Sequence, residues 1–310
     1  MWRWLLLVGC LSGVTGCYDF TGDLGRIGFV SNLSVRADQK WDPTHPIASG
    51  TRAEFVAVEI IGKDSEEEPD VTGRVRGRSL EVEEDGPEVA VTGAGHARGK
   101  VSFRGDATDR FSFGFSPASR VTLVDPVLAA MEEEDVDTGA IAVVRGATLT
   151  LWPEVTDARG RVLGWDPDDL EPSAMGPISA WREGAEVHIT ADGRAGARGL
   201  VDFQLLGASF SELEVLVADM DAIQELEILT EVTEFDEGTL VIASVVGRLE
   251  DGTRLHGIAP DWSWTGGEEV DDAPKRGDVI VLGFEHGAVF TEVEADLNGL
   301  IVHERVPLSN

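Results

Sequence analysis

The chain has 310 residues, of which 42% are hydrophobic and 36 are glycine, and its formal net charge is −32 at pH 7. A chain with so large an excess of acid is repelled by nucleic acid and by anionic lipid surfaces, because both are bound through basic residues. The length and the hydrophobic content predict two or three globular domains and argue against global disorder.

The first residues are typical of an export signal. One positive charge, in Met1-Trp2-Arg3, precedes the apolar run Trp4 to Val14, which is long enough for a secretory signal. It is too short to cross a bilayer, which needs roughly 20 apolar residues. The run ends in VTGC, which resembles the lipobox of bacterial lipoproteins. The resemblance implies cleavage after Gly16, a diacylglyceryl group on Cys17 and acylation of the new amino terminus.

A second lipobox-like match, LVGC, ends at Cys10. Cleavage there would leave an apolar core of about five residues, which is shorter than signals normally use, so Cys17 is favoured. The chain has only these two cysteines. After cleavage Cys17 has no partner for an intrachain disulfide, and its thiol is free for lipid. We expect attachment to a membrane of the bacterial cell envelope through acyl chains. Tyr18 is not the aspartate that retains some lipoproteins in an inner membrane, so the outer membrane is favoured.

Three glycine-led segments suggest an internal repeat. They are IASGT at 47–51, VVRGA at 143–147 and FDEGT at 235–239, and each precedes a strand-like run: AEFVAVEI, TLTLWPEV and LVIASVVG. Their glycines lie about 90 to 100 residues apart, the size of one β-sandwich domain. A second internal similarity relates HARGKVSF at 96–103 to GARGLVDF at 196–203.

The segments between these landmarks are predicted to be strands. Apolar and polar residues alternate in RFSFGF at 110–115, AEVHIT at 185–190 and FTEVEADL at 290–297, a period that buries one face of a sheet. Turn signals separate them: EDGP at 84–87, ADG at 191–193 and EDG at 250–252. Only PVLAAMEEED at 126–135 and ADMDAIQELE at 218–227 look helical or linker-like, and both fall between repeats.

The second and third repeats share an order of features. In one, Gly146 before an early strand is followed by the Asp157-Ala158-Arg159-Gly160 turn and then by a predicted strand that carries Trp165. In the other, Gly238 is followed by the Asp251-Gly252 turn and then by a predicted strand that carries Trp262 and Trp264. This order resembles bacterial immunoglobulin-like modules, which occur in tandem on envelope proteins. The resemblance covers roughly residues 127–310, since the first repeat lacks the tryptophan. It implies an all-β fold of tandem immunoglobulin-like β-sandwich domains and a binding or spacing role.

The predicted organisation follows from the signal and the repeats. It consists of a signal peptide at 1–16, a tether at 17–28, a β-sandwich domain at 29–126, and immunoglobulin-like domains at 127–221 and 222–310.

No catalytic or metal-binding motif stands out. The histidines are scattered without metal-binding spacing: His45, His96, His188, His256, His286 and His303. His188 and His303 fall on the solvent faces of their predicted strands. GASFSE fails the nucleophile-elbow pattern at its last position, and GAGHARG is spaced wrongly for a dinucleotide fingerprint. We predict no enzyme activity and no cofactor, although a catalytic site assembled from distant residues stays open.

Two weaker patterns suggest ligands. Asp135 and Asp137 precede Gly139 at a predicted domain junction, where clustered oxygens could bind calcium, although acidic runs are usually solvated linkers. Five tryptophans could form a sugar-stacking platform: Trp152, Trp165, Trp181, Trp262 and Trp264. Trp262 and Trp264 share one strand face and form either this platform or part of a core, and the core is favoured because sandwiches commonly bury a tryptophan.

We therefore expect a non-enzymatic, lipid-anchored envelope protein that acts as a structural, adhesion or assembly module and binds other envelope proteins or glycans. The alternatives are a carbohydrate-binding surface lipoprotein and an exported hydrolase.

Overall fold

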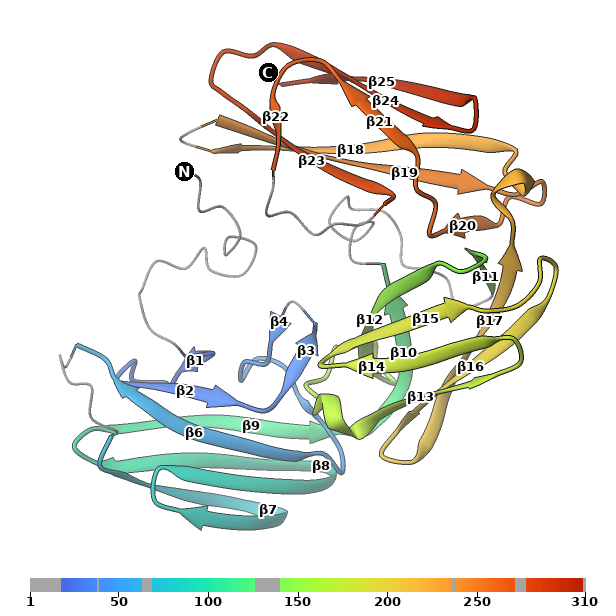
Figure 1. Cartoon of the computed structure of the whole chain (residues 1–310). Helices are drawn as coiled ribbons and strands as arrows, with labels where there is room; N and C mark the ends of the chain where they lie inside the picture. Colours follow the sequence, from blue (N-terminus) through green and yellow to red (C-terminus); the bar gives the residue numbers. More distant parts are fainter. Residues whose placement is uncertain are drawn as a thin grey trace.

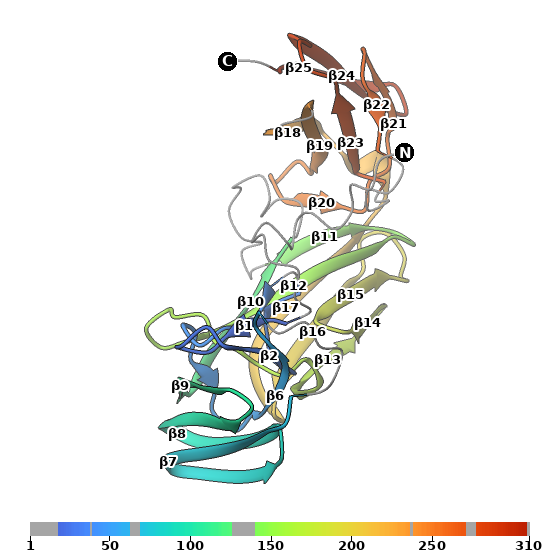
Figure 2. The same ribbon diagram turned by 90° about the vertical axis from the view of Figure 1, so that its left-hand side faces the viewer.

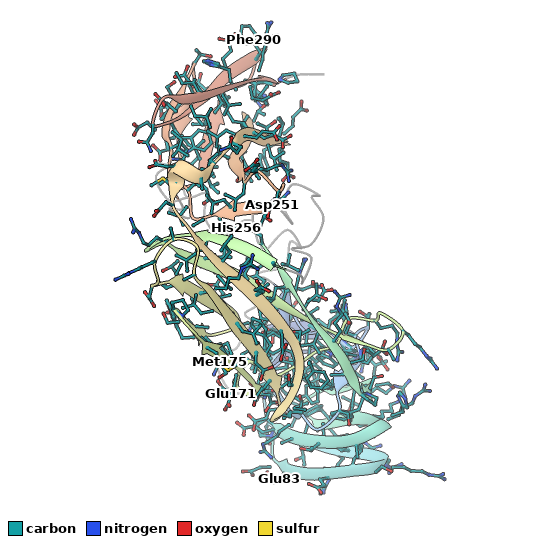
Figure 3. All side chains as sticks on the ribbon, turned by 90° about the vertical axis from the view of Figure 1, so that its right-hand side faces the viewer. Glu83, Glu171, Met175, Asp251, His256 and Phe290 are labelled. Carbon is teal, nitrogen blue, oxygen red and sulfur yellow. The ribbon has the colours of Figure 1, made fainter. Side chains whose placement is uncertain are left out.

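The computed structural model describes residues 18–37, 39–62, 69–125, 140–235, 238–270 and 277–308. Within these ranges the chain is all-β, with two 3-10 turns, η1 Pro167–Asp169 and η2 Met220–Ala222, as its helical elements. None of the helices there is long or apolar enough to span a membrane. The strands form tandem sandwich modules of immunoglobulin-like layout, which follow one another as module 1 (β1 to β9), module 2 (β10 to β17) and module 3 (β18 to β25) (Figures 1 and 2). Glu83 and Phe290 lie near the opposite ends (Figure 3).

Module 1 is built on a bent sheet whose order is β1-β2-β6-β8-β9-β5, with β7 paired to β8. The strands are β1 Phe20–Thr21, β2 Ile27–Ser31, β5 Ile47–Ala48, β6 Arg52–Ile60, β7 Val71–Asp85, β8 Glu88–Gly105 and β9 Thr108–Ser116, and a small hairpin adds β3 Ser34–Arg36 and β4 Gln39–Lys40. Strand β8 bends the sheet, because its first part pairs with β6 and its last part with β9. Phenylalanines at alternate positions fill the core, and Phe55 lies 5.1 Å from Phe111 between ring centroids.

The start of the described chain is fixed to module 1. Strand β1 pairs with β2, and the buried carboxylate of Asp109 accepts hydrogen bonds from the amides of Leu24 at 2.9 Å, Arg26 at 2.7 Å and Ile27 at 3.0 Å. Residues 20–28, which the sequence predicts as part of a tether, are instead held in the first sheet because this loop satisfies its amides on a buried side chain.

Module 2 is a sandwich of two sheets. One sheet has the order β10-β12-β15-β14, with β10 Ala118–Val124, β12 Thr148–Asp157, β15 Glu186–Ala191 and β14 Ile178–Glu183. The facing layer has the order β13-β16-β17-β11, with β13 Leu170–Met175, β16 Arg198–Leu205, β17 Ala208–Ala218 and β11 Ala140–Val144. Because β10 pairs with β12, residues 118–124 belong with module 2 and precede the predicted domain boundary at 127. We therefore propose a boundary close to residue 117.

Module 3 continues the second sheet of module 2. Strand β11 runs parallel to both β17 and β20, so the sheet passes from one module into the next. Its module 3 part contains β20 Arg254–His256, β19 Gly238–Arg248, β23 Val279–Phe284 and β22 Glu268–Glu269, with β18 Glu225–Phe235 also paired to β19. The facing sheet contains β21 Asp261–Trp264, β24 Phe290–Leu297 and β25 Leu300–Pro307. At this joint His256 Nδ1 lies 3.4 Å from Asp125 Oδ2, with both side chains buried (Figure 3).

The predicted strands are confirmed where hydrophobic alternation is regular. The runs AEFVAVEI, TLTLWPEV, LVIASVVG and FTEVEADL lie in β6, β12, β19 and β24. The predicted helix or linker at 218–227 is only partly right, because a single 3-10 turn is followed by β18 from Glu225. The segment 126–135 lies outside the described residues.

Candidate functional site

The predicted anchor and calcium residues lie outside the described part of the chain. These residues are Gly16, Cys17, Asp135, Asp137 and Gly139. Within the described ranges no group of three or more metal-ligating side chains occurs. Among the described residues, the candidate sites are the tryptophan clusters and the joint between modules 1 and 2.

Trp262 and Trp264 pack against the core of module 3. Both lie on β21, both are half-buried, and both contact the core cluster of that module. The indole Nε1 of Trp262 donates a hydrogen bond to the carbonyl oxygen of Gly277 at 3.2 Å. This packing favours a structural role, because a stacking platform needs an indole face open to the ligand.

Trp165 lies at the joint between modules 1 and 2. The sequence resemblance places this residue on a strand of module 2, but it lies between strands, in an isolated bridge with Ser34 of module 1. Its indole is 0% exposed and its Nε1 donates to the carbonyl oxygen of Val35 at 3.2 Å. The side chain thus packs in the core of module 2 while it hydrogen-bonds module 1.

Backbone hydrogen bonds hold the same segment to module 1. Ser34 and Trp165 exchange two bonds of 2.9 Å, and Gly164 donates to Pro46 and accepts from Ala48, both at 2.7 Å. A Cβ at Gly164 would lie 2.1 Å from Cδ1 of the buried Trp41, so only glycine permits this approach. The joint is therefore a hydrogen-bonded and packed interface between modules.

Trp181 and Trp152 share the outer face of the β12-β15-β14 sheet. Trp181 is 43% exposed and stacks on His188, with 5.3 Å between ring centroids and 22° between the planes. On the same face, next to the Trp181–His188 pair, Trp152 Nε1 donates a hydrogen bond to Glu186 Oε1 at 3.1 Å. The predicted solvent face of β15 is therefore correct, but Trp181 covers His188, whose side chain is only 14% exposed.

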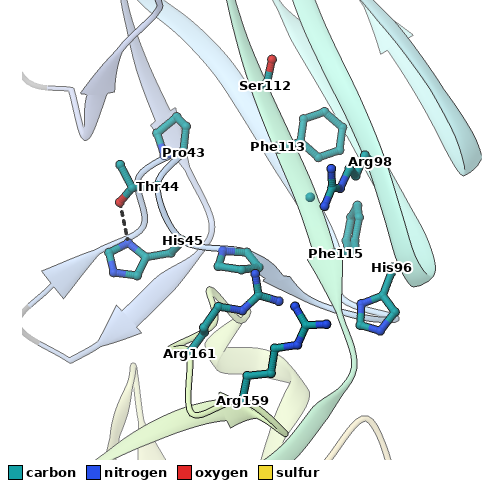
Figure 4. Close-up of a pocket in the computed structure, with 12 residues that line it drawn as sticks. Pro43, Thr44, His45, His96, Arg98, Ser112, Phe113, Phe115, Arg159 and Arg161 are labelled. Atoms are coloured by element: carbon teal, nitrogen blue, oxygen red, sulfur yellow. Dashed lines mark hydrogen bonds between the residues drawn. The ribbon is translucent and has the colours of Figure 1, made fainter.

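A pocket of about 320 Å³ opens at the joint of modules 1 and 2 (Figure 4). Its basic side chains are His45, His96, Arg98, Arg159 and Arg161. The histidines and Arg98 come from module 1, and Arg159 and Arg161 come from the turn that follows β12. No aspartate or glutamate lines this pocket within the described part of the chain, although acids outnumber Lys and Arg by 57 to 25 in the whole sequence.

The two turn arginines differ in their partners. Arg161 contacts Asp157 Oδ2 through NH2 at 2.7 Å and through Nε at 2.9 Å, and Asp157 also accepts the 3.1 Å hydrogen bond of Ser116. Burial alone would raise the pKa of Asp157, but the amide and guanidinium of Arg161, the Arg159 amide and the Ser116 hydroxyl together hold that pKa well below its usual range. The described residues place no carboxylate within ion-pair distance of the Arg159 or Arg98 guanidinium.

Sequence reasoning singled out the five tryptophans and the Asp157–Gly160 turn but did not find this pocket. The turn itself is confirmed, since Gly160 donates to the carbonyl oxygen of Asp157 at 2.9 Å. The signal that the sequence offers is the Arg-Gly-Arg spacing of Arg159 and Arg161, two basic residues close together in a chain where acids outnumber Lys and Arg by 57 to 25. No pattern in the sequence locates Arg98, which reaches the pocket from β8 of module 1.

No protein-family model matches the chain, and no curated protein matches it. Among solved structures, the Escherichia coli adhesin FdeC is 13% identical with a TM-score of 0.25, over 90% of this chain and 97% of that one. Invasin, a bacterial integrin-binding protein, is 13% identical with a TM-score of 0.24, over 91% and 60%. Domains 5–6 of the S-layer protein SbsC are 13% identical with a TM-score of 0.24, over 62% and 100%. The fold assignment rests on this chain's own strand pairing.

Proposed function

We propose that the chain is a non-enzymatic, lipid-anchored protein of the bacterial cell envelope that serves as a stiff spacer for adhesion or assembly. The observation that carries the proposal is the construction of its joints. Trp165 and its backbone bonds fasten module 2 to module 1, and β11 extends one sheet from module 2 into module 3. Modules joined by flexible linkers move independently, whereas modules joined in this way keep a fixed distance between the anchored end and the far end.

The anchored end is proposed to be Cys17, after cleavage behind Gly16. Strand β1 begins at Phe20, three residues after Cys17. The Asp109 carboxylate holds the loop that follows β1 by hydrogen bonds to its amides. Module 1 would therefore sit directly at the lipid surface, preferably that of the outer membrane. Attachment must come from the acyl chains, because a chain with a net charge of −32 gains nothing from anionic lipid.

The far end offers a contact for a protein partner. In module 3 Val289 is 66% exposed and Phe290 is 44% exposed, with the Arg305 guanidinium 4.1 Å from the centre of the Phe290 ring. Exposed aromatic and arginine side chains are typical of interface hot spots. We assign the partner-facing role to this end, which lies at the opposite end of the molecule from Glu83 of module 1 (Figure 3).

Mass spectrometry of the N-terminal peptide from membrane-extracted protein tests the anchor. A diacylglyceryl-modified Cys17 is expected, whereas an unmodified Cys17 still joined to Gly16 would refute the anchor. Crosslinking in native membranes, followed by purification, tests the role. A partner protein recovered in fixed ratio, with crosslinks to module 3, supports assembly or adhesion. Turnover of a fluorogenic substrate panel would favour the exported hydrolase instead.

A second candidate function, carbohydrate binding, is favoured by the exposed face of Trp181. An indole stacked on His188 presents a flat apolar surface, and the carboxylates of Glu183 and Glu186 lie 3.9 and 3.8 Å from His188 Nε2, ready to accept hydrogen bonds from sugar hydroxyls. On a glycan array, Trp181→Ala should abolish binding and Trp262→Ala, which alters a packed tryptophan, should retain it. Binding that survives Trp181→Ala would remove this candidate.

A further inference from the structure

We propose that the pocket between modules 1 and 2 binds an oxyanion, a carboxylate or phosphate group carried by a ligand of about the size of one sugar ring. This site is independent of the lipid anchor and of the Trp181 face. It rests on the charges that line the pocket, on its dimensions, and on its position across a joint that is itself fixed.

The charge of the pocket is opposite to that of the chain. Three guanidinium groups, those of Arg98, Arg159 and Arg161, meet in one opening in a protein with a net charge of −32 (Figure 4). At physiological salt, charges more than about 8 Å away are largely screened, so the surrounding acidic surface does not cancel this local field. An anion that enters the pocket therefore experiences the arginines rather than the net charge.

The nearest acids leave two of these guanidinium groups available. Asp157 neutralises Arg161 from outside the pocket, and Asp42 Oδ1 lies 3.5 Å from His45 Nδ1. Arg98 and Arg159 have no such partner among the described residues, and they approach from different modules. A planar guanidinium offers paired N–H donors that match a carboxylate or a phosphate. An anion held between Arg98 and Arg159 would satisfy guanidinium donors that no carboxylate of the described residues pairs with.

The remaining lining fits a small ring. The rings of Phe113 and Phe115 and the prolines Pro43 and Pro46 supply apolar surface, while the hydroxyls of Thr44 and Ser112 can bond to ligand hydroxyls. The volume of about 320 Å³ lies at the small end of ligand pockets, enough for one ring with its charged substituent. A long polymer could place only one acidic residue here.

The joint fixes the two sides of the pocket. Arg159 follows β12 and belongs to the turn whose Asp157 hydrogen-bonds Ser116, the last residue of β9. Phe113 and Phe115 of the pocket wall lie on that same strand. The backbone segments that carry Arg98 and Arg159 are therefore held relative to each other before the ligand arrives, which lowers the entropic cost of binding.

Calorimetric titration of the mature chain tests the proposal, with glucuronate, glucose 1-phosphate and glucose as probes at about 150 mM salt, where the surrounding acids are screened. Saturable binding of at least one charged probe, with a dissociation constant of about 1 mM or tighter, is expected, together with a loss of affinity as salt rises. The charged probe that binds more tightly identifies the oxyanion as carboxylate or phosphate. Glucose should not bind.

Three variants locate the site. Arg98→Gln and Arg159→Gln each remove one unpaired guanidinium and should weaken binding about tenfold, whereas Arg104→Gln, an exposed arginine on β8 outside the pocket, removes the same charge and should leave the affinity unchanged. Arg161 is kept because its loss would leave Asp157 unpaired. Equal affinity for glucose and the charged probes, no binding of either charged probe, or equal weakening by Arg104→Gln would overturn the proposal.

Discussion

Replacing Trp165 by alanine should uncouple modules 1 and 2. The indole is fully buried, and a buried tryptophan removes roughly 200 Å² from water, worth about 5 kcal/mol at 25 cal/mol per Å². Measured losses for such truncations run from about 3 to 5 kcal/mol, because the site partly collapses. The lost hydrogen bond to Val35 adds about 1 kcal/mol. We therefore expect a destabilisation of about 4 to 6 kcal/mol.

The assay is differential scanning calorimetry of the mature chain, since a chain of several modules does not unfold in one two-state step. Modules 1 and 2 together have some 200 residues, for which 1 kcal/mol lowers the melting temperature by about 2 to 4 °C. Their transition should fall by about 10 °C or more, and it should split if the modules separate. Module 3, whose sheet continues from module 2 through β11, should shift less than modules 1 and 2. The matched variant Trp262→Ala should shift the module 3 transition more than that of module 1. A Trp165→Ala protein whose module 1 transition does not move would refute the reasoning.

Two further predictions concern buried carboxylates. Asp109→Ala leaves three loop amides without an acceptor and should cost about 3 kcal/mol; hydrogen exchange at residues 22–31 should accelerate while exchange in module 3 does not change. The pKa of Asp157 is lower in the folded chain than in the unfolded chain. The Asp157 carboxylate therefore stabilises the fold fully above pH 3.8, the ordinary pKa of an aspartate, and this stabilisation is lost as the pH falls through the folded pKa. Chemical denaturation between pH 7 and pH 2 should therefore show a shallower acid decline for Asp157→Asn than for the parent, and equal slopes would contradict the assignment.

The strands could be predicted from the sequence because period-two alternation is a local signal. Thr148–Asp157 and Phe290–Leu297 are found as expected, since each buries one face of its own sheet. The sequence predicts a strand at Trp165, but this residue lies between strands because its environment is set by Ser34 and Val35, far away in the chain. No local pattern reports such a contact.

The two candidate sites differ in whether they depend on such distant contacts. The Trp181 face requires the register that sets Trp181 opposite His188, which a hairpin pattern could supply. The pocket requires Arg98 and Arg159 to meet across two modules, which only the folded joint provides. Residues that act within one hairpin were within reach of sequence reasoning, and residues that act across a joint were not.

The position of β11 between β17 and β20 also governs how the chain can be divided and how it avoids self-association. An unpaired strand edge is a template for aggregation, and β11 covers two such edges at once. A fragment that begins at residue 222 would expose β20, and one that ends at residue 221 would expose the edge of β11 that pairs with β20. Modules 2 and 3 are therefore best expressed as one piece, and soluble fragments should retain residues 140–144 together with both neighbours.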